Sequence, residues 1–238
     1  MNALAAFGSI GAFLAASGAV SYATFRPGCN CWGKVHSHGS RKRAAVALTF
    51  DDGPTPPFTG QILDILRDAK APAAFFIVGK NAIQHPDLIL RIHAEGHAIG
   101  NHTYSHPIYG WLRGAAYWRN QIQRTDDLVQ SITGERPRFF RTPMGIKSFL
   151  TLRAARQTGH ATVAWSCRAY DGLQTDSATI LSRLLAARAG DILLLHDGVA
   201  PNNYRNDRSP TVAALPALIE GLRRRGFDFV ALPELLGV

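Results

Sequence analysis

Cysteine is scarce in this chain, which has only three among its 238 residues: Cys29, Cys31 and Cys167. Three cysteines cannot build the disulfide framework of a small secreted domain, and their spacing offers no paired Cys-x-x-Cys hooks for structural zinc. We therefore predict reduced thiols without a catalytic role. With 46% apolar residues, the chain is long enough to bury the core of one sizeable globular domain.

Acidic residues are also few, since 17 Asp and Glu stand against 26 Lys and Arg and give a net charge of +9. No stripe of Lys and Arg interleaved with aromatic residues indicates a nucleic-acid partner. Residues 1–43 contain no acid and carry five of the nine net positive charges: Arg26, Lys34, Arg41, Lys42 and Arg43. The charge therefore indicates proximity to a membrane surface with anionic lipids.

Charged residues are absent from Ala3 to Phe25, a stretch that reaches the roughly 20 residues needed to cross a bilayer. We predict a membrane anchor here; the alternatives are a loosely packed helix and a cleaved signal peptide, although no basic residue precedes the run. The cations that follow favour a catalytic domain on the cytoplasmic side of the inner membrane, with export as the alternative. The predicted division is an apolar anchor with a basic juxtamembrane linker at 1–43 and a catalytic domain at 44–238.

A Gly-x-Gly-x-x-Gly motif is absent after the first predicted strand, which argues against a dinucleotide-binding fold. Seven apolar runs alternate with six amphipathic stretches, a pattern typical of a buried parallel sheet covered by helices. We therefore predict a TIM-like barrel with about seven parallel strands. The predicted strands are 44–50, 73–78, 97–103, 138–142, 160–166, 191–196 and 227–232, and the predicted helices are 59–70, 85–96, 115–134, 148–159, 177–190 and 211–226. Glycines at helix C-caps are predicted at Gly96, Gly134, Gly159, Gly190 and Gly226.

Polar residues stand where the predicted strands end. The carboxyl ends of parallel barrel strands share one face, which is where active sites are built. We therefore expect residues that are scattered in sequence to converge in space: Asp51, Asp52, His102, Arg141, Asp171 and His196.

His102 and His106 are four residues apart, a spacing that allows two imidazoles to approach one ion. An aspartate from the first strand would complete a site of two histidines and one carboxylate, which suits a divalent cation. If one of the adjacent Asp51 and Asp52 binds the ion, the other is free to accept a proton from water. Zinc fits these ligands best, and cobalt or nickel could take the same geometry. Six other histidines have no matching partners and are expected to have surface or structural roles: His36, His38, His85, His93, His97 and His160.

Five motifs in this order resemble those of the NodB-type polysaccharide deacetylases, carbohydrate esterase family four: "TFDDGP", "HTYSHP", "RTPMG", "WSCRAYDG" and "LLLHDG". The resemblance runs from about Ala44 to the C-terminus. It implies the NodB homology fold, a distorted (β/α) barrel, and a metal-dependent deacetylase.

The resemblance also implies a role for each matching residue. Asp51 would be the general base, oriented by Arg141, and His196 the general acid, tuned by Asp171. Asp52, His102 and His106 would hold the metal ion. The backbone N–H of Met144, next to Pro143, would help to hold the oxyanion. Such an acyl transfer to water needs a base, an electrophile and an acid for the leaving amine.

The chain departs from the family pattern at three positions that border the sugar. Met144 stands where the family usually has an aromatic residue, and Arg168 and Gly172 replace an Asp and a Trp of the fourth motif. We expect these changes to alter substrate preference more than chemistry. Trp111 and Tyr117 are candidates to line the groove, whereas Trp118 is at least as well suited to the core.

The expected function is therefore removal of N-acetyl groups from amino sugars of an oligo- or polysaccharide, such as chito-oligosaccharide or cell-wall N-acetylglucosamine. Two alternatives stay open. One is deacetylation or deformylation of a polyprenyl-linked sugar at the inner membrane, and the other is a carbohydrate-binding protein that keeps the metal without catalysis. The expected partners are an N-acetylated glycan or glycolipid and, through residues 3–25, a membrane.

Overall fold

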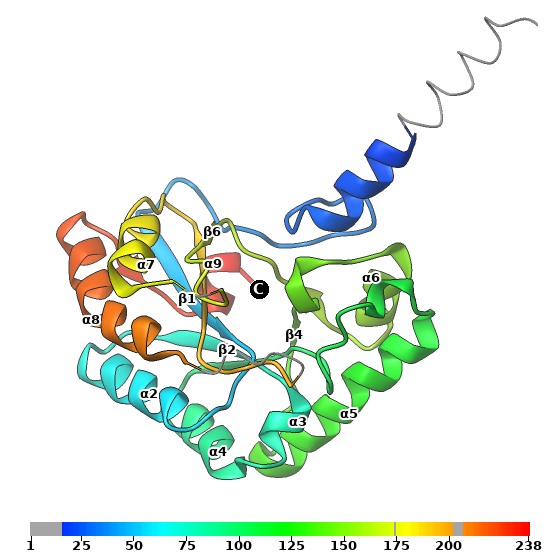
Figure 1. The fold of residues 1–238 in the computed structure, drawn as a ribbon, viewed down its shortest axis with the longest axis horizontal. Coiled ribbons are helices and arrows are strands. Elements are labelled where there is room, and N and C mark those ends of the chain that lie inside the picture. The colour runs from blue at the N-terminus through cyan, green and yellow to red at the C-terminus, as the bar shows by residue number, and fades with distance from the viewer. Residues whose placement is uncertain (1–15, 174, 202–206) are drawn as a thin grey trace, which may run out of the picture.

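Eight parallel strands form one curled sheet in the computed structural model, which describes residues 16–173, 175–201 and 207–238 (Figure 1). The strand order is β5-β4-β3-β2-β1-β7-β6, and β8 pairs with the beginning of β1. All seven predicted strands are present. The strands are β1 (Ala45–Asp51), β2 (Ala73–Ile77), β3 (Ala98–Asn101), β4 (Phe139–Phe140), β5 (Ala161–Thr162), β6 (Cys167–Arg168), β7 (Ile192–His196) and β8 (Asp228–Phe229).

Helices cover the outer side of the sheet (Figure 1). The six predicted helices are confirmed, and the short helices α3 and α9 and the helical residues 16–25 are additional. The helices are α2 (Phe58–Asp68), α3 (Gly79–Ala82), α4 (Pro86–Ala94), α5 (Ala115–Thr133), α6 (Phe149–Gln157), α7 (Ser177–Leu184), α8 (Ser209–Arg224) and α9 (Leu232–Leu236), with 3-10 turns η1 (Gly110–Leu112) and η2 (Pro143–Gly145).

Four of the five predicted cap glycines follow helix ends with left-handed φ angles between 78° and 85°: Gly96, Gly134, Gly159 and Gly226. The prediction was wrong for Gly190, because α7 already ends at Leu184. Gly190 lies instead in the turn before β7, where a Cβ would stand 2.6 Å from the carbonyl oxygen of Ser40. Close approach of another backbone, and not helix capping, requires glycine there.

The fifth predicted strand divides into two. Residues 161–162 pair with β4 as β5, whereas β6 pairs with β7, and the strand pairings of the described residues leave the sheet open between β5 and β6. Residues 36–39 cross this opening. The N–H of His36 donates to Thr162, the N–H of Ala164 donates to His36, and the N–H of Gly39 donates to Gly190. The barrel is therefore completed by a segment from the predicted linker.

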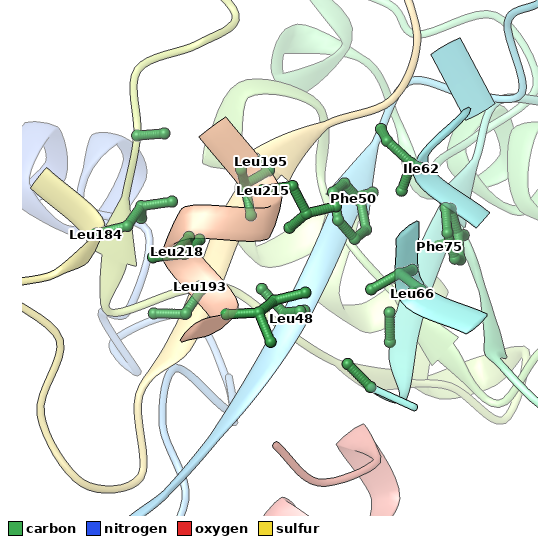
Figure 2. Packing of buried hydrophobic residues seen from close by; sticks show 14 of the residues in the cluster. Leu48, Phe50, Ile62, Leu66, Phe75, Leu184, Leu193, Leu195, Leu215 and Leu218 are labelled. Atoms are coloured by element: carbon green, nitrogen blue, oxygen red, sulfur yellow. The ribbon is translucent and has the colours of Figure 1, made fainter. Parts of the chain in front are cut away.

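Alternation along β1 decides what faces the helices. Val46, Leu48 and Phe50 belong to the larger apolar core between sheet and helices, and Figure 2 shows side chains of that core from β1, β7, α2 and α8 packed together. Ala45 and Ala47 point the other way, into a second cluster inside the curl that includes Phe76 and Phe139. Because side chains in a strand alternate, Thr49 and Asp51 also face the interior of the curl.

The N-terminal segment packs on the barrel. Val35 is buried against Leu152 and Ala164, and the buried amine of Lys147 donates to the carbonyl oxygens of Arg26 and Pro27 at 2.6 and 3.0 Å. Residues 1–15 of the predicted apolar anchor lie outside the described residues. Within the described ranges, the search for a helix long and apolar enough to cross a membrane finds none.

Candidate active site at the carboxyl ends of the strands

The backbone at the end of β1 sends two adjacent carboxylates into one cleft. Alternation points Asp51 into the curl and would point Asp52 toward the helices. Asp52 escapes this alternation because its backbone is left-handed, with φ of 74°. Asp tolerates that region better than most residues, and such outliers cluster at functional sites. Both carboxylates therefore line the same cleft.

Asp51 is paired with a buried arginine. Arg141 Nη1 lies 2.6 Å from Asp51 Oδ1 and also donates to the hydroxyl of Thr49 at 2.9 Å. Its Nη2 and Nε donate to the backbone carbonyls of Ala164 and Val163, and its guanidinium stacks on Phe76. Arg141 is completely buried, so these contacts fix the direction of Asp51.

Asp52, His102 and His106 converge on one point. Asp52 Oδ1 lies 3.5 Å from His102 Nε2 and 3.3 Å from His106 Nε2. Ligand atoms that each stand about 2.0–2.1 Å from a tetrahedral ion are about 3.3–3.4 Å apart. Asp52 Oδ1 is buried and accepts no hydrogen bond from the residues that the structure describes. This donor set therefore fits a divalent cation.

The surroundings prepare these residues for a cation. His102 Nδ1 lies 2.9 Å from the carbonyl oxygen of Arg141, a contact that directs Nε2 toward Asp52. Burial alone would raise the pKa of Asp52, but His106 and His102 outweigh it and hold that pKa well below its usual range. Asn81 donates to the backbone carbonyl of Asp52 at 2.7 Å and steadies the turn.

His196 forms a second acid–base pair beside the first. β7 pairs with β1 in a register that sets His196 opposite Asp51. His196 Nδ1 lies 2.9 Å from Asp171 Oδ1, and Thr211 donates to Asp171 Oδ2 at 2.9 Å. Burial opposes the charge of His196, but the Asp171 carboxylate outweighs burial and raises the pKa of His196 to about 9. His196 is therefore protonated near neutral pH.

The cleft above these groups has a volume of about 470 Å³. Its walls include all three positions that depart from the family pattern, Met144, Arg168 and Gly172. A Cβ on Gly172 would stand 3.1 Å from His196 Cε1, so glycine leaves room beside that ring. The aromatic wall comes from Trp165 and Tyr170.

The aromatic wall of the cleft does not include the three aromatic residues considered from the sequence, Trp111, Tyr117 and Trp118, all of which the structure describes. Trp118 lies in the core, only 1% exposed. Trp111 packs edge to face on Phe25, and Tyr117 packs edge to face on Trp118.

All nine residues predicted for the site thus gather at one end of the barrel. Asp51, Asp52, His102, His106, Met144 and His196 line the cleft, while Arg141, Pro143 and Asp171 are buried behind it.

The sequence analysis missed supporting residues. Thr211 and Asn81 carry no motif that could have marked them. Asp197 did have a signal, because it follows His196 in "LLLHDG"; it is fully buried, burial raises its pKa to about 7, and it accepts a hydrogen bond from Thr59 at 2.6 Å.

Comparisons with known proteins agree with this site. The sequence profile described as polysaccharide deacetylase matches residues 38–163, more than half of the chain. The chain belongs to the polysaccharide deacetylase family. It is accordingly an enzyme of the hydrolase class, and the resemblance inferred from the five motifs is confirmed.

Two relatives in this family have similar length. A chitooligosaccharide deacetylase from Bradyrhizobium sp. (strain ANU 289) is 38% identical over 80% of this chain and 90% of its own. A peptidoglycan-N-acetylglucosamine deacetylase from Bacillus cereus (strain ATCC 14579) is 38% identical over 80% of this chain and 87% of its own.

Solved structures of the family share the fold. A crystal structure of a peptidoglycan N-acetylglucosamine deacetylase bound to a substituted N-hydroxybenzamide superposes with a TM-score of 0.79 at 34% identity, covering 86% of this chain and 93% of the other. A pseudoenzyme of carbohydrate esterase family four from Bacillus anthracis has a TM-score of 0.77 at 23% identity, covering 84% of this chain and 68% of the other, which shows the fold alone. The expected distorted (β/α) barrel is therefore confirmed.

Proposed function

We propose that this polysaccharide deacetylase removes N-acetyl groups from N-acetylglucosamine units of a glycan in a metal-dependent reaction. One observation carries the proposal: Asp51 and His196, each paired with a buried partner, line a single cleft with the Asp52, His102 and His106 triad. A base, an acid and a cation site within one cleft are what amide hydrolysis requires. The names of the relatives support an N-acetylated glycan as the substrate.

Asp52, His102 and His106 would hold the ion, with zinc as the best fit and cobalt or nickel as alternatives. When bound, a divalent ion supplies Lewis-acid polarisation of the amide carbonyl and lowers the pKa of water.

The side chains then divide the proton transfers. Asp51, held by Arg141, accepts the proton of the attacking water. His196 donates its proton to the amine that leaves when the carbon–nitrogen bond breaks, because an unprotonated amine is a poor leaving group. The backbone N–H of Met144, in the turn that begins at Pro143, is proposed to donate to the oxyanion.

The direct test is acetate release from a panel of substrates: chito-oligosaccharides, peptidoglycan fragments and N-acetylglucosamine carried on a polyprenyl phosphate. For at least one glycan, we expect release of acetate together with a decrease in the mass of the glycan that corresponds to loss of one acetyl group. If no member of the panel loses an acyl group, the proposed function is wrong. Activity on the lipid-linked sugar alone would favour the polyprenyl alternative.

Asp171→Asn is expected to move the alkaline limb of the kcat/KM profile to lower pH. The imidazolium of His196 is the active acid, so activity falls as pH rises through its pKa of about 9. Removing the Asp171 charge lets that pKa fall toward the ordinary value of about 6.5, so the limb should move by more than about one pH unit. Thr211→Val keeps the negative charge of Asp171 and should move the alkaline limb less. An unchanged limb in Asp171→Asn would contradict the assignment of His196.

Arg168 is proposed to select glycans that carry an acidic substituent near the acetamide. Its guanidinium lines the cleft, stacked 3.9 Å from the centroid of the Tyr170 ring and donating to the Tyr170 hydroxyl. Arg168→Gln should lower kcat/KM at least about tenfold for a carboxylated or phosphorylated glycan, the worth of a charge-assisted hydrogen bond. Neutral glycans should change much less. Arg183→Gln, which also removes a cation over Tyr170, is the control, and equal losses on both glycans would refute the selection.

Membrane association and the division into an anchor and a catalytic domain stay proposals. Membrane association rests on the uncharged run from Ala3 to Phe25 and on the cations after it, with residues 44–238 as the catalytic domain. Binding without catalysis is disfavoured because the proposed proton-transfer residues Asp51 and His196 are both present in the cleft with their partners.

A further inference from the structure

Two cysteines face each other in the turn that precedes the barrel. Cys29 Sγ and Cys31 Sγ lie 2.8 Å apart, and the backbone N–H of Cys31 also points to Cys29 Sγ at 3.4 Å. Both are free thiols. We propose that Cys29 and Cys31 are a covalent modification site, at which a low-molecular-weight disulfide oxidises the pair to a reversible intramolecular disulfide.

The fold holds the two sulfurs in this arrangement. The N–H of Cys29 donates to the carbonyl of Arg26 at 3.0 Å, and the N–H of Gly33 donates to the carbonyl of Asn30 at 3.1 Å. The side chain of Asn30, between the two cysteines, accepts from the N–H of Val35 at 2.7 Å. These bonds close the turn on both sides of the pair, so its sulfurs are brought together by the native structure and not only by their nearness in sequence.

The two thiols differ in access and in charge environment. Cys31 is exposed and Cys29 is buried. Burial would raise the pKa of Cys29, but the hydrogen bonds of Cys31, helped by the charges of Lys147 and Arg26, outweigh it and lower that pKa. Lys147 is itself only 1% exposed and is tied to the carbonyls of Arg26 and Pro27. A cation near a thiol favours the thiolate, which is the reactive form.

Access assigns the order of the exchange, because Cys31 is the exposed thiol of the pair even though its hydrogen bond with Cys29 raises its pKa. Cys31 loses its proton and attacks the small disulfide, whose sulfur–sulfur bond breaks and releases one small thiol. Cys29 loses its proton and attacks Cys31 Sγ in the mixed disulfide, which forms the Cys29–Cys31 bond and releases the second small thiol. The protein loses two protons and two electrons, which together are two hydrogen atoms, and the small disulfide gains them.

Cys167 does not take part. It lies in β6, burial raises the pKa of its thiol to about 11, and its sulfur contacts the carbonyl of Arg183. It is therefore an internal control for reactivity that depends on the Cys29–Cys31 turn.

The turn that holds the two cysteines lies next to the Pro143–Gly145 turn, which carries Met144 in the wall of the proposed substrate cleft. A Cβ on Gly145 would stand 2.9 Å from Pro27 Cγ, so the turn that begins at Arg26 packs directly on the Pro143–Gly145 turn that carries Met144. Only the Pro143–Gly145 turn thus lies between the modified turn and the wall of the cleft at Met144.

The test equilibrates the purified full chain with mixtures of reduced and oxidised glutathione, quenches with acid, and counts remaining thiols by maleimide labelling and mass spectrometry. The native chain should fall from three labelled thiols to one and lose two hydrogen atoms in the peptide that contains both cysteines. Cys167→Ser should fall from two labels to none. Cys31→Ser should form no intramolecular disulfide.

Repeating the titration in urea separates the fold from sequence proximity. The native chain should form the disulfide at a ratio of oxidised to reduced glutathione at least about tenfold lower than the unfolded chain, which corresponds to about 30 mV. Equal midpoints in both states would overturn the proposal, as would glutathione adducts or cross-linked dimers in place of the internal bond. None of these readouts uses deacetylase activity, so they stand apart from the proposed function.

Discussion

Replacing Asp51 by Asn is expected to lower kcat by about 10²–10⁴-fold, the usual contribution of a positioned general base. Asn keeps the size of the side chain but cannot accept the proton of water. Asp52, His102 and His106 are untouched, so metal content should stay at one ion per chain. KM should change little, because the Asn side chain has the size of Asp and leaves the position of the substrate in the cleft unchanged. Steady-state kinetics together with metal analysis of the same preparation measures both quantities.

The control must account for a structural cost. Arg141 is buried, and removing its partner charge leaves it uncompensated, which for a buried pair costs about 3–5 kcal/mol of folding free energy. Asp191→Asn is the control variant, because Asp191 is also buried and paired with an arginine, the partly exposed Arg41, at the opposite end of β7. Asp191→Asn should lose stability and keep its kcat. Turnover of Asp51→Asn within a few-fold of the wild type would contradict Asp51 as the base.

Replacing His106 by Gln is expected to weaken zinc binding by more than about 100-fold and to abolish acetate release with it. Changes to residues that only orient a ligand already cost about 10–100-fold in affinity, and loss of a ligand should cost more. His106 is held by a left-handed backbone, with φ of 49°, and its N–H donates to the hydroxyl of Thr103 at 3.0 Å. The imidazole is therefore positioned by the chain before any ion arrives.

His97→Gln is the matched control for this variant. His97 is also buried, but it precedes β3 at the other end of the barrel and accepts from the N–H of Ala73. Calorimetric titration of the chelator-treated chains with zinc should give wild-type affinity for His97→Gln and greatly reduced affinity for His106→Gln. Adding zinc back to the chelator-treated His97→Gln variant should return its activity to the wild-type level. Equal zinc affinity in the two variants would show that the ion, if one binds, lies elsewhere.

The sequence predicted those parts of the fold that local patterns control. Long strands such as β1 and β7 are nearly continuous apolar runs, and the six helices carry apolar faces at helical spacing, so both were found. Strands β4, β5 and β6 have two residues each, and they exist through pairing with distant neighbours. No local signal distinguishes one strand at 160–166 from two strands with a break between them.

The candidate site also contains residues that the sequence could predict and residues that it could not. Residues that end strands could be grouped because parallel strands share an edge, and this reasoning brought Asp51, His102 and His196 together. Residues that act through the tertiary structure could not be found. Thr211 reaches Asp171 from the first turn of α8, 40 positions along the chain. Trp165 reaches the cleft only because the chain turns between β5 and β6.

Residues 36–39 cross the opening between β5 and β6, and this has a consequence for solubility. Exposed strand edges pair with strands of other molecules and promote aggregation. His36 and Gly39 occupy backbone groups of Thr162, Ala164 and Gly190 that would otherwise be free to do so. A chain shortened to begin at Ala44 would keep every residue proposed for catalysis, yet it would present these groups to its neighbours. We therefore expect the segment before the barrel to protect the enzyme against self-association.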